Sequence, residues 1–291
     1  MEIGISTPAM VPGMTRELFL EWARKADASP FASLGVTDRI VYSNWEPLIA
    51  LAAAAALTTR VKLVTHILMS TLRNTGILVK QVTTIDQLSG GRLILGLGVG
   101  SRVEDFDAAP SPIHERGKIM EAQLQAFRNH WAGQPIAEGL PAFGPAPGQP
   151  GGPPILIGGR TPNPLRRAGQ VADGYIAGTN YTAVSLHEHF QQVEAAWEEA
   201  GRPGKPLLAA IDYYALGSDA DVDAGRNYIQ TYYAAMGTGA SRLARGVKST
   251  PQEIRDTLRE FKDAGVDHYL LMPTVPNIQQ FDRLAEVVAG S

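Results

Sequence analysis

A short segment at 158–162, Gly-Gly-Arg-Thr-Pro, combines the residue types that bind a phosphate group. It stands between an apolar run and a segment with helical periodicity, and a proline directly after Thr161 is typical of a helix start. Free backbone N–H groups at that helix end, the helix dipole and the guanidinium of Arg160 would converge on one anion. The segment predicts a phosphate site, with Gly178 and Thr179 as a neighbouring wall. An ordinary strand-to-helix turn with an exposed arginine has the same pattern.

A second segment, Ser89–Gly100, ends an apolar strand in alternating glycines at positions 96, 98 and 100. Glycines at the end of a buried strand leave room for a flat ring against the backbone, or they mark a tightly packed barrel corner. The spacing alone does not separate these two interpretations. The run also approaches a dinucleotide fingerprint, but it lacks the third glycine and a good helix start at Ser101. A Rossmann site is therefore disfavoured.

Few titratable residues are placed for catalysis. His66 is the one histidine expected in the carboxyl half of a strand, where it is either structural or catalytic. Asp38 and Arg39 end the second strand and Arg73 follows the third, so that they either line a site or form ion pairs at its rim. The acidic run at 104–107 predicts solvated surface or helix caps. No cluster has metal-ligand spacing and no nucleophile elbow is present, so we predict no metal site.

The elements that position these residues alternate regularly. Helical segments separate eight strand-like runs at 2–6, 31–40, 61–68, 93–97, 154–159, 174–178, 207–216 and 268–272. This alternation predicts parallel strands in an α/β fold, and eight units indicate a single (β/α)₈ barrel, of the TIM type, over residues 1–291. A doubly wound sheet is the alternative. The irregular segment at 133–154 is expected to be a functional or mobile loop.

Composition limits the partners and the compartment. The chain has 291 residues, a formal net charge of −3 and no cysteine, which disfavours nucleic acid as a partner and excludes thiolate catalysis. We expect no signal peptide and no membrane span, since the sequence enters a strand at once and its most apolar run is short. A cytoplasmic location is the expectation. Apolar faces on the helices at 46–57 and 79–88 are compatible with a homodimer or with packing on the barrel.

Several motifs, in this order, resemble the luciferase-like monooxygenase family. They are Ser89–Gly100, His114–Gly117, Trp131-x-Gly133, Pro153–Gly159, Leu165–Ala168 and Ala172–Gly174. The resemblance covers most of the chain, and the motifs are specific as a set. It implies a (β/α)₈ barrel that binds FMN or the deazaflavin F420 at its carboxyl face, with a covering helical region at about 217–249.

The resemblance also assigns site residues. It implies that Gly158, Gly159, Arg160 and Thr161 hold the cofactor phosphate, that Gly98 and Gly100 border the ring system, and that a bulged third strand carries a non-proline cis peptide at His66–Ile67. The full set of cofactor-binding residues expected is Ser6, Thr65, His66, Ile67, Gly98, Gly100, Gly158, Gly159, Arg160, Thr161, Gly178 and Thr179.

The chain departs from the family after two strands. Arg39 stands where many members have histidine, and Arg73-Asn74-Thr75 stands where many have Arg-His-Pro. The leading hypothesis is a monooxygenase that uses O₂ and reduced FMN, supplied by a separate reductase, on a small organic substrate in a water-poor pocket closed in part by the 133–154 loop. His66, Arg39 and Asp38 are the candidate catalytic residues. The alternatives are F420-dependent hydride transfer and a non-catalytic flavin-binding homologue.

Overall fold

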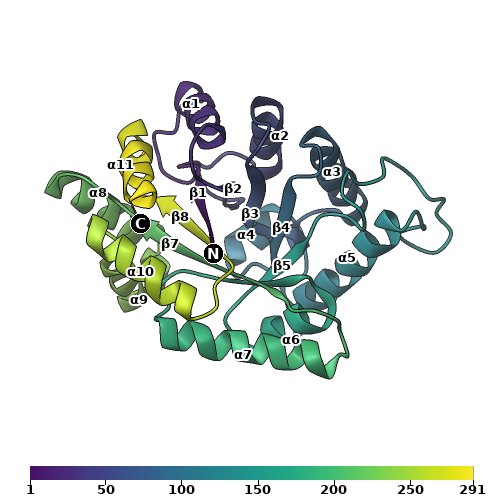
Figure 1. The fold of residues 1–291 in the computed structure, drawn as a ribbon. Helices are drawn as coiled ribbons and strands as arrows, with labels where there is room; N and C mark the ends of the chain where they lie inside the picture. The colour runs from purple at the N-terminus through teal and green to yellow at the C-terminus, as the bar shows by residue number, and fades with distance from the viewer. Residues whose placement is uncertain (291) are drawn as a thin grey trace.

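The computed structural model describes residues 1–290, in which eight parallel strands close into a barrel (Figure 1). Each strand pairs with its neighbours in chain order, and β1 pairs with β8 through Glu2 beside His268. Because the sheet has no free edge, the doubly wound alternative is excluded and the predicted (β/α)₈ barrel is confirmed. The strands are β1 (Glu2–Ser6), β2 (Ser33–Val36), β3 (Lys62–Met69), β4 (Leu93–Gly98), β5 (Ile155–Gly158), β6 (Gly174–Ala177), β7 (Leu207–Tyr214) and β8 (His268–Pro273).

Helices surround the barrel and begin at the capping residues that the sequence offers. Thr15 and Asn74 accept hydrogen bonds from the first turns of α1 and α3, and Thr250 forms a capping box with Glu253. The helices are α1 (Arg16–Asp27), α2 (Pro47–Leu57), α3 (Thr75–Leu88), α4 (Val103–Ala108), α5 (Arg116–Trp131), α6 (Pro162–Val171), α7 (Ala183–Glu199), α8 (Asp219–Tyr232), α9 (Thr238–Arg245), α10 (Pro251–Asp263) and α11 (Ile278–Ala289), with short 3₁₀ turns η1 (Ser70–Leu72), η2 (Ile113–Glu115) and η3 (Ala234–Met236).

Strand alternation divides the core into two layers. Side chains such as Val64 and Leu270 fill the barrel interior, whereas Leu63 and Tyr269 face outward and pack under the helices. The outer layer is the larger one and contains the T-shaped contact between Trp22 and Phe281, with ring centroids 5.3 Å apart. This packing fixes the strand ends and therefore the loops that follow them.

Strand β3 is irregular at the place where the family resemblance implies it. Its register with β4 shifts between Thr65 and Leu68, and the peptide bond between His66 and Ile67 is cis. Both implied features of this strand are confirmed. The bulge turns the side chains of His66 and Ile67 toward the carboxyl end of the barrel.

The irregular segment between α5 and β5 lies away from the carboxyl ends of the strands. It connects the end of a helix to the start of a strand, and it is held on α3 by Asp86, whose carboxylate accepts hydrogen bonds from Gly148 N at 2.7 Å and Gln149 N at 3.0 Å. Figure 1 shows this loop projecting beside α3 and α5. The expectation that it closes the pocket is wrong, because a helix-to-strand connection in a barrel belongs to the opposite face.

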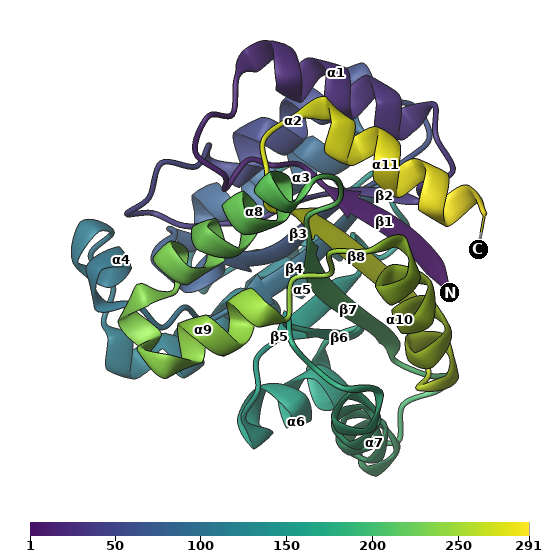
Figure 2. The ribbon, with the colours of Figure 1, turned by 90° about the vertical axis from the view of Figure 1, so that its left-hand side faces the viewer.

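The segment between β7 and α10 covers the carboxyl side instead. It contains α8, η3 and α9, and Figure 2 shows α8 and α9 on the same side of the molecule as α4, which follows the carboxyl end of β4. Within residues 1–290 no helix combines the length and the apolar character that crossing a bilayer requires.

Candidate functional site

A cavity of about 730 Å³ lies at the carboxyl ends of the strands. Its volume is within the usual range for small-molecule and cofactor sites. Every strand from β2 to β8 contributes to its wall, at its last residues or in the turn that follows. The residues that the argument below uses are Arg39, His66, Ile67, Gly98, Gly158, Arg160, Thr161, Tyr213, Tyr232 and Tyr233.

One end of the cavity carries a cation without an acidic partner. Arg160 forms no ion pair with any described carboxylate; its guanidinium donates to the Thr179 carbonyl and lies with its carbon 4.2 Å from the centroid of the Tyr181 ring. Thr161 is the N-cap of α6, yet its side chain makes no capping hydrogen bond. A hydroxyl, backbone N–H groups and a guanidinium are therefore free to bind one anion.

The backbone around Arg160 is held from behind by buried polar groups. Tyr175 donates its hydroxyl to the Gly159 carbonyl at 2.6 Å. The loop after β6 is fixed by Asp212, whose carboxylate accepts from Asn180 N at 3.1 Å and from the Tyr269 hydroxyl at 3.0 Å. Burial raises the pKa of Asp212, while the positive charge of Lys248 and these two donors oppose that rise.

The floor of the cavity is the side chain of Ile67, seated between two glycines. A Cβ atom at Gly98 would lie 2.3 Å from Ile67 Cδ1, and one at Gly158 would lie 2.8 Å from the same atom. The glycines therefore make room for Ile67, which supports the packing interpretation of the glycine run. A flat ring at this position would rest on the isoleucine rather than on bare main chain.

His66 lies beside this floor with one ring nitrogen occupied. Its Nε2 is 2.7 Å from Ser6 Oγ, and Ser6 donates its hydrogen to the Gly35 carbonyl at 3.1 Å. Nε2 is therefore assigned the proton, which leaves Nδ1 as a buried acceptor with no partner among the described residues. Burial lowers the pKa of His66 to about 3, so the imidazole is neutral near pH 7.

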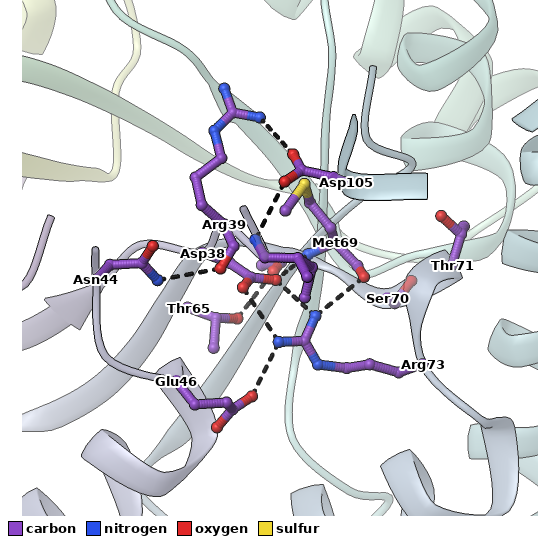
Figure 3. A network of polar contacts seen from close by, with 12 residues as sticks. Asp38, Arg39, Asn44, Glu46, Thr65, Met69, Ser70, Thr71, Arg73 and Asp105 are labelled. Atoms are coloured by element: carbon purple, nitrogen blue, oxygen red, sulfur yellow. Dashed lines mark hydrogen bonds and ion pairs between the residues drawn. The ribbon is translucent and has the colours of Figure 1, made fainter. Parts of the chain in front are cut away.

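Asp38 is committed to a buried ion pair (Figure 3). Its Oδ2 accepts from Arg73 Nη1 at 2.6 Å and from Met69 N at 2.8 Å, and its Oδ1 accepts from Arg73 Nη2 at 3.1 Å. Arg73 also contacts Glu46 at 2.9 Å. This bidentate pair ties the end of β2 to the turn after β3, and it leaves no carboxylate oxygen of Asp38 free for proton transfer.

Arg39 belongs to a separate network on the same wall. Its Nη1 contacts the buried Asp105 at 3.2 Å, while its Nε donates to the Tyr232 hydroxyl at 2.6 Å. Asp105 also accepts from the backbone N–H groups of Ile40 at 3.2 Å and Val41 at 2.8 Å. The expectation that the acidic run at 104–107 is solvated is wrong for Asp105, because the short helix α4 turns this residue toward the loop after β2.

The sequence model of the luciferase-like monooxygenase family matches residues 1–248. The chain belongs to this family. The match covers all strands up to β7 and both networks described above. It confirms the resemblance stated from the motifs, and members of the luciferase-like family are oxidoreductases that act with a flavin or with F420.

Similar proteins include a reductase, a monooxygenase and an F420-dependent dehydrogenase. The 5,10-methylenetetrahydromethanopterin reductase of Methanolobus tindarius is 28% identical over 204 residues, covering 68% of this chain and 61% of the reductase. The chain thus spans about three fifths of the length of the curated relatives it matches first. Among solved structures, the monooxygenase RslO1 from Streptomyces bottropensis is 20% identical with a TM-score of 0.84, over 100% of this chain and 98% of that one. An F420-dependent secondary alcohol dehydrogenase, solved with an F420–acetone adduct, gives 19% identity and a TM-score of 0.79, over 99% and 98% of the two chains. At these identities the structures support the fold alone.

The structure brings most of the predicted site residues of this luciferase-like protein to one cavity. His66, Ile67, Gly98, Gly100, the 158–161 segment, Gly178 and Thr179 all line it, as do Asp38 and Arg39. Two predicted cofactor contacts are corrected. Ser6 supports His66 from behind, and Thr65 donates to the Gly96 carbonyl at 2.8 Å, so neither lines the wall. Val64 faces the barrel interior, and Thr65, the next residue of the strand, points to the opposite side.

Sequence reasoning missed the tyrosines of the wall. Tyr213 on β7, Tyr232 at the end of α8 and Tyr233 directly after it line the cavity. The Tyr213 and Tyr233 hydroxyls are 2.9 Å apart, and the Tyr232 and Tyr233 rings meet edge to face at 4.7 Å. The position of Tyr232 and Tyr233 in the predicted covering region was the available signal for these two, but nothing local indicates which residues of such a region face inward. Tyr213 lies outside that region, on β7.

Proposed function

We propose that this protein is a flavin-dependent monooxygenase that uses reduced FMN and O₂ to oxygenate a small organic substrate. The observation that carries the proposal is Arg160, a cation without a carboxylate partner, beside the free N-cap of α6 at one end of the cavity. A single phosphate fits this donor set, because backbone N–H groups at a helix start and a guanidinium both prefer an oxyanion.

The remaining residues fit a flavin. Ile67 supports the ring from below, Gly158–Thr161 bind the phosphate, and His66 Nδ1 is an acceptor for a ring N–H or for a substrate hydroxyl. Bound reduced FMN supplies the electrons that activate O₂. Arg39 and the three cavity tyrosines, Tyr213, Tyr232 and Tyr233, exclude water and orient the substrate. Asp38 holds the loop that carries Arg39. A separate flavin reductase delivers the reduced cofactor.

F420-dependent hydride transfer is the second candidate. A relative that is 28% identical, from Methanolobus tindarius, is named as a reductase and not as a monooxygenase, which favours this candidate. F420 has a longer anionic tail, which calls for several free cations near the mouth. Of the four arginines in the cavity wall, Arg39 and Arg167 pair with carboxylates, and Arg102 at the rim pairs with Glu104. Arg116 and Arg160 remain, and this small number favours FMN.

The test offers FMN and F420 together to the purified protein and identifies the retained cofactor by its absorbance spectrum and mass. We expect FMN to be retained and O₂ uptake to rise when a reductase and a substrate are supplied. Retention of F420 with oxygen-independent turnover would support the second candidate. Tight FMN binding with no O₂ consumption under any reductant would identify a non-catalytic homologue.

We further propose that the protein is a homodimer joined through α2 and α3. Helix α2 carries no charged residue, and it exposes Ile49 at 69%, while α3 exposes Ile77 at 61%. These two helices pack side by side, and their exposed isoleucines are the apolar contacts that they offer to a second copy. Light scattering would give twice the 31.2 kDa chain mass for the wild type. Ile49→Glu should give the monomer, and an unchanged dimer would contradict this interface.

A further inference from the structure

The part of the cavity wall formed by Arg39, Tyr213, Tyr232 and Tyr233 is rich in hydrogen-bond donors. Arg39 Nε donates to the Tyr232 hydroxyl oxygen at 2.6 Å, so the phenol acts as the acceptor in that contact. No described residue accepts the hydrogen of Tyr232. The hydroxyl hydrogen is therefore available to the cavity, and the neighbouring guanidinium polarises the O–H bond.

A second donor comes from the neighbouring tyrosine pair. The hydroxyls of Tyr213 and Tyr233 are 2.9 Å apart, and only one of the two hydrogens lies between the oxygens. The other has no acceptor among the described residues. Burial raises the pKa of all three wall tyrosines, so these phenols stay protonated at ordinary pH.

Both carboxylates on this wall are already paired with an arginine. Asp105 receives Arg39 and two backbone N–H groups, and Asp38 receives Arg73 and the Met69 N–H. The hydroxyl oxygen of Tyr232 likewise accepts from Arg39. A ligand that brings an oxygen acceptor satisfies these donors, while one that brings a charged amine finds no counter-charge.

The rings add a preference for shape. Tyr232 and Tyr233 meet at 4.7 Å and Tyr213 lies 6.3 Å from Tyr233, so one side of the cavity is a continuous aromatic surface. Such a surface packs best against flat, unsaturated groups. Met272, the register partner of Tyr213 on β8, and Ile67 add apolar contacts to the cavity wall.

We propose that Tyr232, oriented by Arg39, binds the carbonyl oxygen of a flat aromatic or conjugated ketone, which is the substrate class of this site. The inference rests on the proposed function only in that the bound ketone would then be oxygenated. The recognition of the carbonyl is a property of the tyrosine wall, defined as Tyr213, Tyr232 and Tyr233, and of Arg39. It requires no particular cofactor.

The test uses two probes of nearly equal shape, 1-tetralone and its oxygen-free counterpart tetralin. Their dissociation constants are measured by calorimetry on the protein with and without FMN. We expect 1-tetralone to bind about tenfold more tightly than tetralin, and Tyr232→Phe to reduce that ratio about three- to tenfold, as for the loss of one hydrogen bond. The infrared carbonyl band of bound 1-tetralone should lie at lower wavenumber in the wild type than in Tyr232→Phe.

Tyr228→Phe is the matched control. Tyr228 is one turn earlier on α8, does not line the cavity and donates its hydroxyl to the Met10 carbonyl at 3.2 Å, so its loss should change neither the ratio nor the band. Equal binding of the two probes by the wild type, or no binding of either, overturns the substrate class. An unchanged ratio and band in Tyr232→Phe overturns the role of Tyr232. Loss of FMN binding with the 1-tetralone preference intact would refute the flavin proposal alone.

Discussion

The guanidinium carbon of Arg160 lies 4.2 Å from the ring centroid of Tyr181, close enough for a cation–π contact. The same guanidinium donates to the carbonyl of Thr179, two residues earlier. Arg160 is exposed, yet the loop after β6 holds it in one orientation at the mouth of the cavity. An arginine fixed in this way loses less side-chain entropy when it binds an anion, which favours tight and specific phosphate recognition.

The first prediction concerns the phosphate. Arg160→Gln should weaken FMN binding about 10- to 100-fold, because a charge-assisted hydrogen bond contributes about 1.5–3 kcal/mol. Riboflavin, which lacks the phosphate, should bind the wild type and the variant within about twofold of each other. Fluorescence quenching of each flavin measures both constants. An equal loss for both flavins would mean that Arg160 does not contact the phosphate.

Asp212 should act on the same phosphate indirectly. Asp212→Ala removes the acceptor of Asn180 N and frees the loop that carries Thr179 and Tyr181, so FMN affinity should fall about fivefold or more while riboflavin affinity is retained. Tyr269→Phe is the control, since it removes the other contact of the same carboxylate without touching the loop. If Asp212→Ala binds FMN as tightly as the wild type does, Arg160 needs no support from this loop.

The Asp38–Arg73 pair should matter for stability. Both side chains are buried, with 0% and 11% exposure, and Arg73→Met would leave Asp38 charged and unpaired. The free energy of unfolding should fall by about 3–5 kcal/mol, measured by urea denaturation. The exposed pair Arg16–Glu17 offers a comparison, since Arg16→Met should change the free energy of unfolding by less than about 1 kcal/mol. Similar losses for the two variants would contradict the buried role of Arg73.

The buried histidines predict an acid-sensitive fold. Burial lowers the pKa of His66 to about 3 and that of His268 to about 4, both below the unfolded value of 6.5. Below pH 6.5 the two histidines take up protons in the unfolded chain but stay neutral in the folded chain. The contribution of the two neutral histidines to the free energy of unfolding is therefore complete above pH 6.5 and is lost as the pH falls toward 4. With two histidines, the slope approaches about 2.7 kcal/mol per pH unit.

Thermal unfolding between pH 7.5 and pH 4.5 measures this loss. His268→Gln should reduce the slope toward that of one histidine, since His268 contacts only Ser33 Oγ at 2.7 Å and takes no part in the cavity wall. A melting temperature independent of pH across this window would show that neither histidine is buried in the neutral form.

The fold and one end of the site could be predicted because their signals are local. A helix start with Pro162 after Thr161, and the alternation of apolar runs with helical segments, are contained in a few adjacent residues. The segment at 158–162 thus predicts a phosphate site, and residues 158–161 lie in the cavity wall. The same local signals could not decide the environment of Asp105, since its burial depends on a loop more than sixty positions earlier.

By itself the sequence determined the strand count, the parallel order and the glycine–arginine turn after β5. These follow from periodicity and turn chemistry within short windows. The irregular third strand was implied by the resemblance to the family. Only the tertiary structure decided that Ile67 occupies the space above Gly98 and Gly158, that Asp38 belongs to Arg73, and that three tyrosines from β7 and α8 face one cavity. These contacts join residues that are far apart in the sequence, and the closure of the barrel brings those residues together.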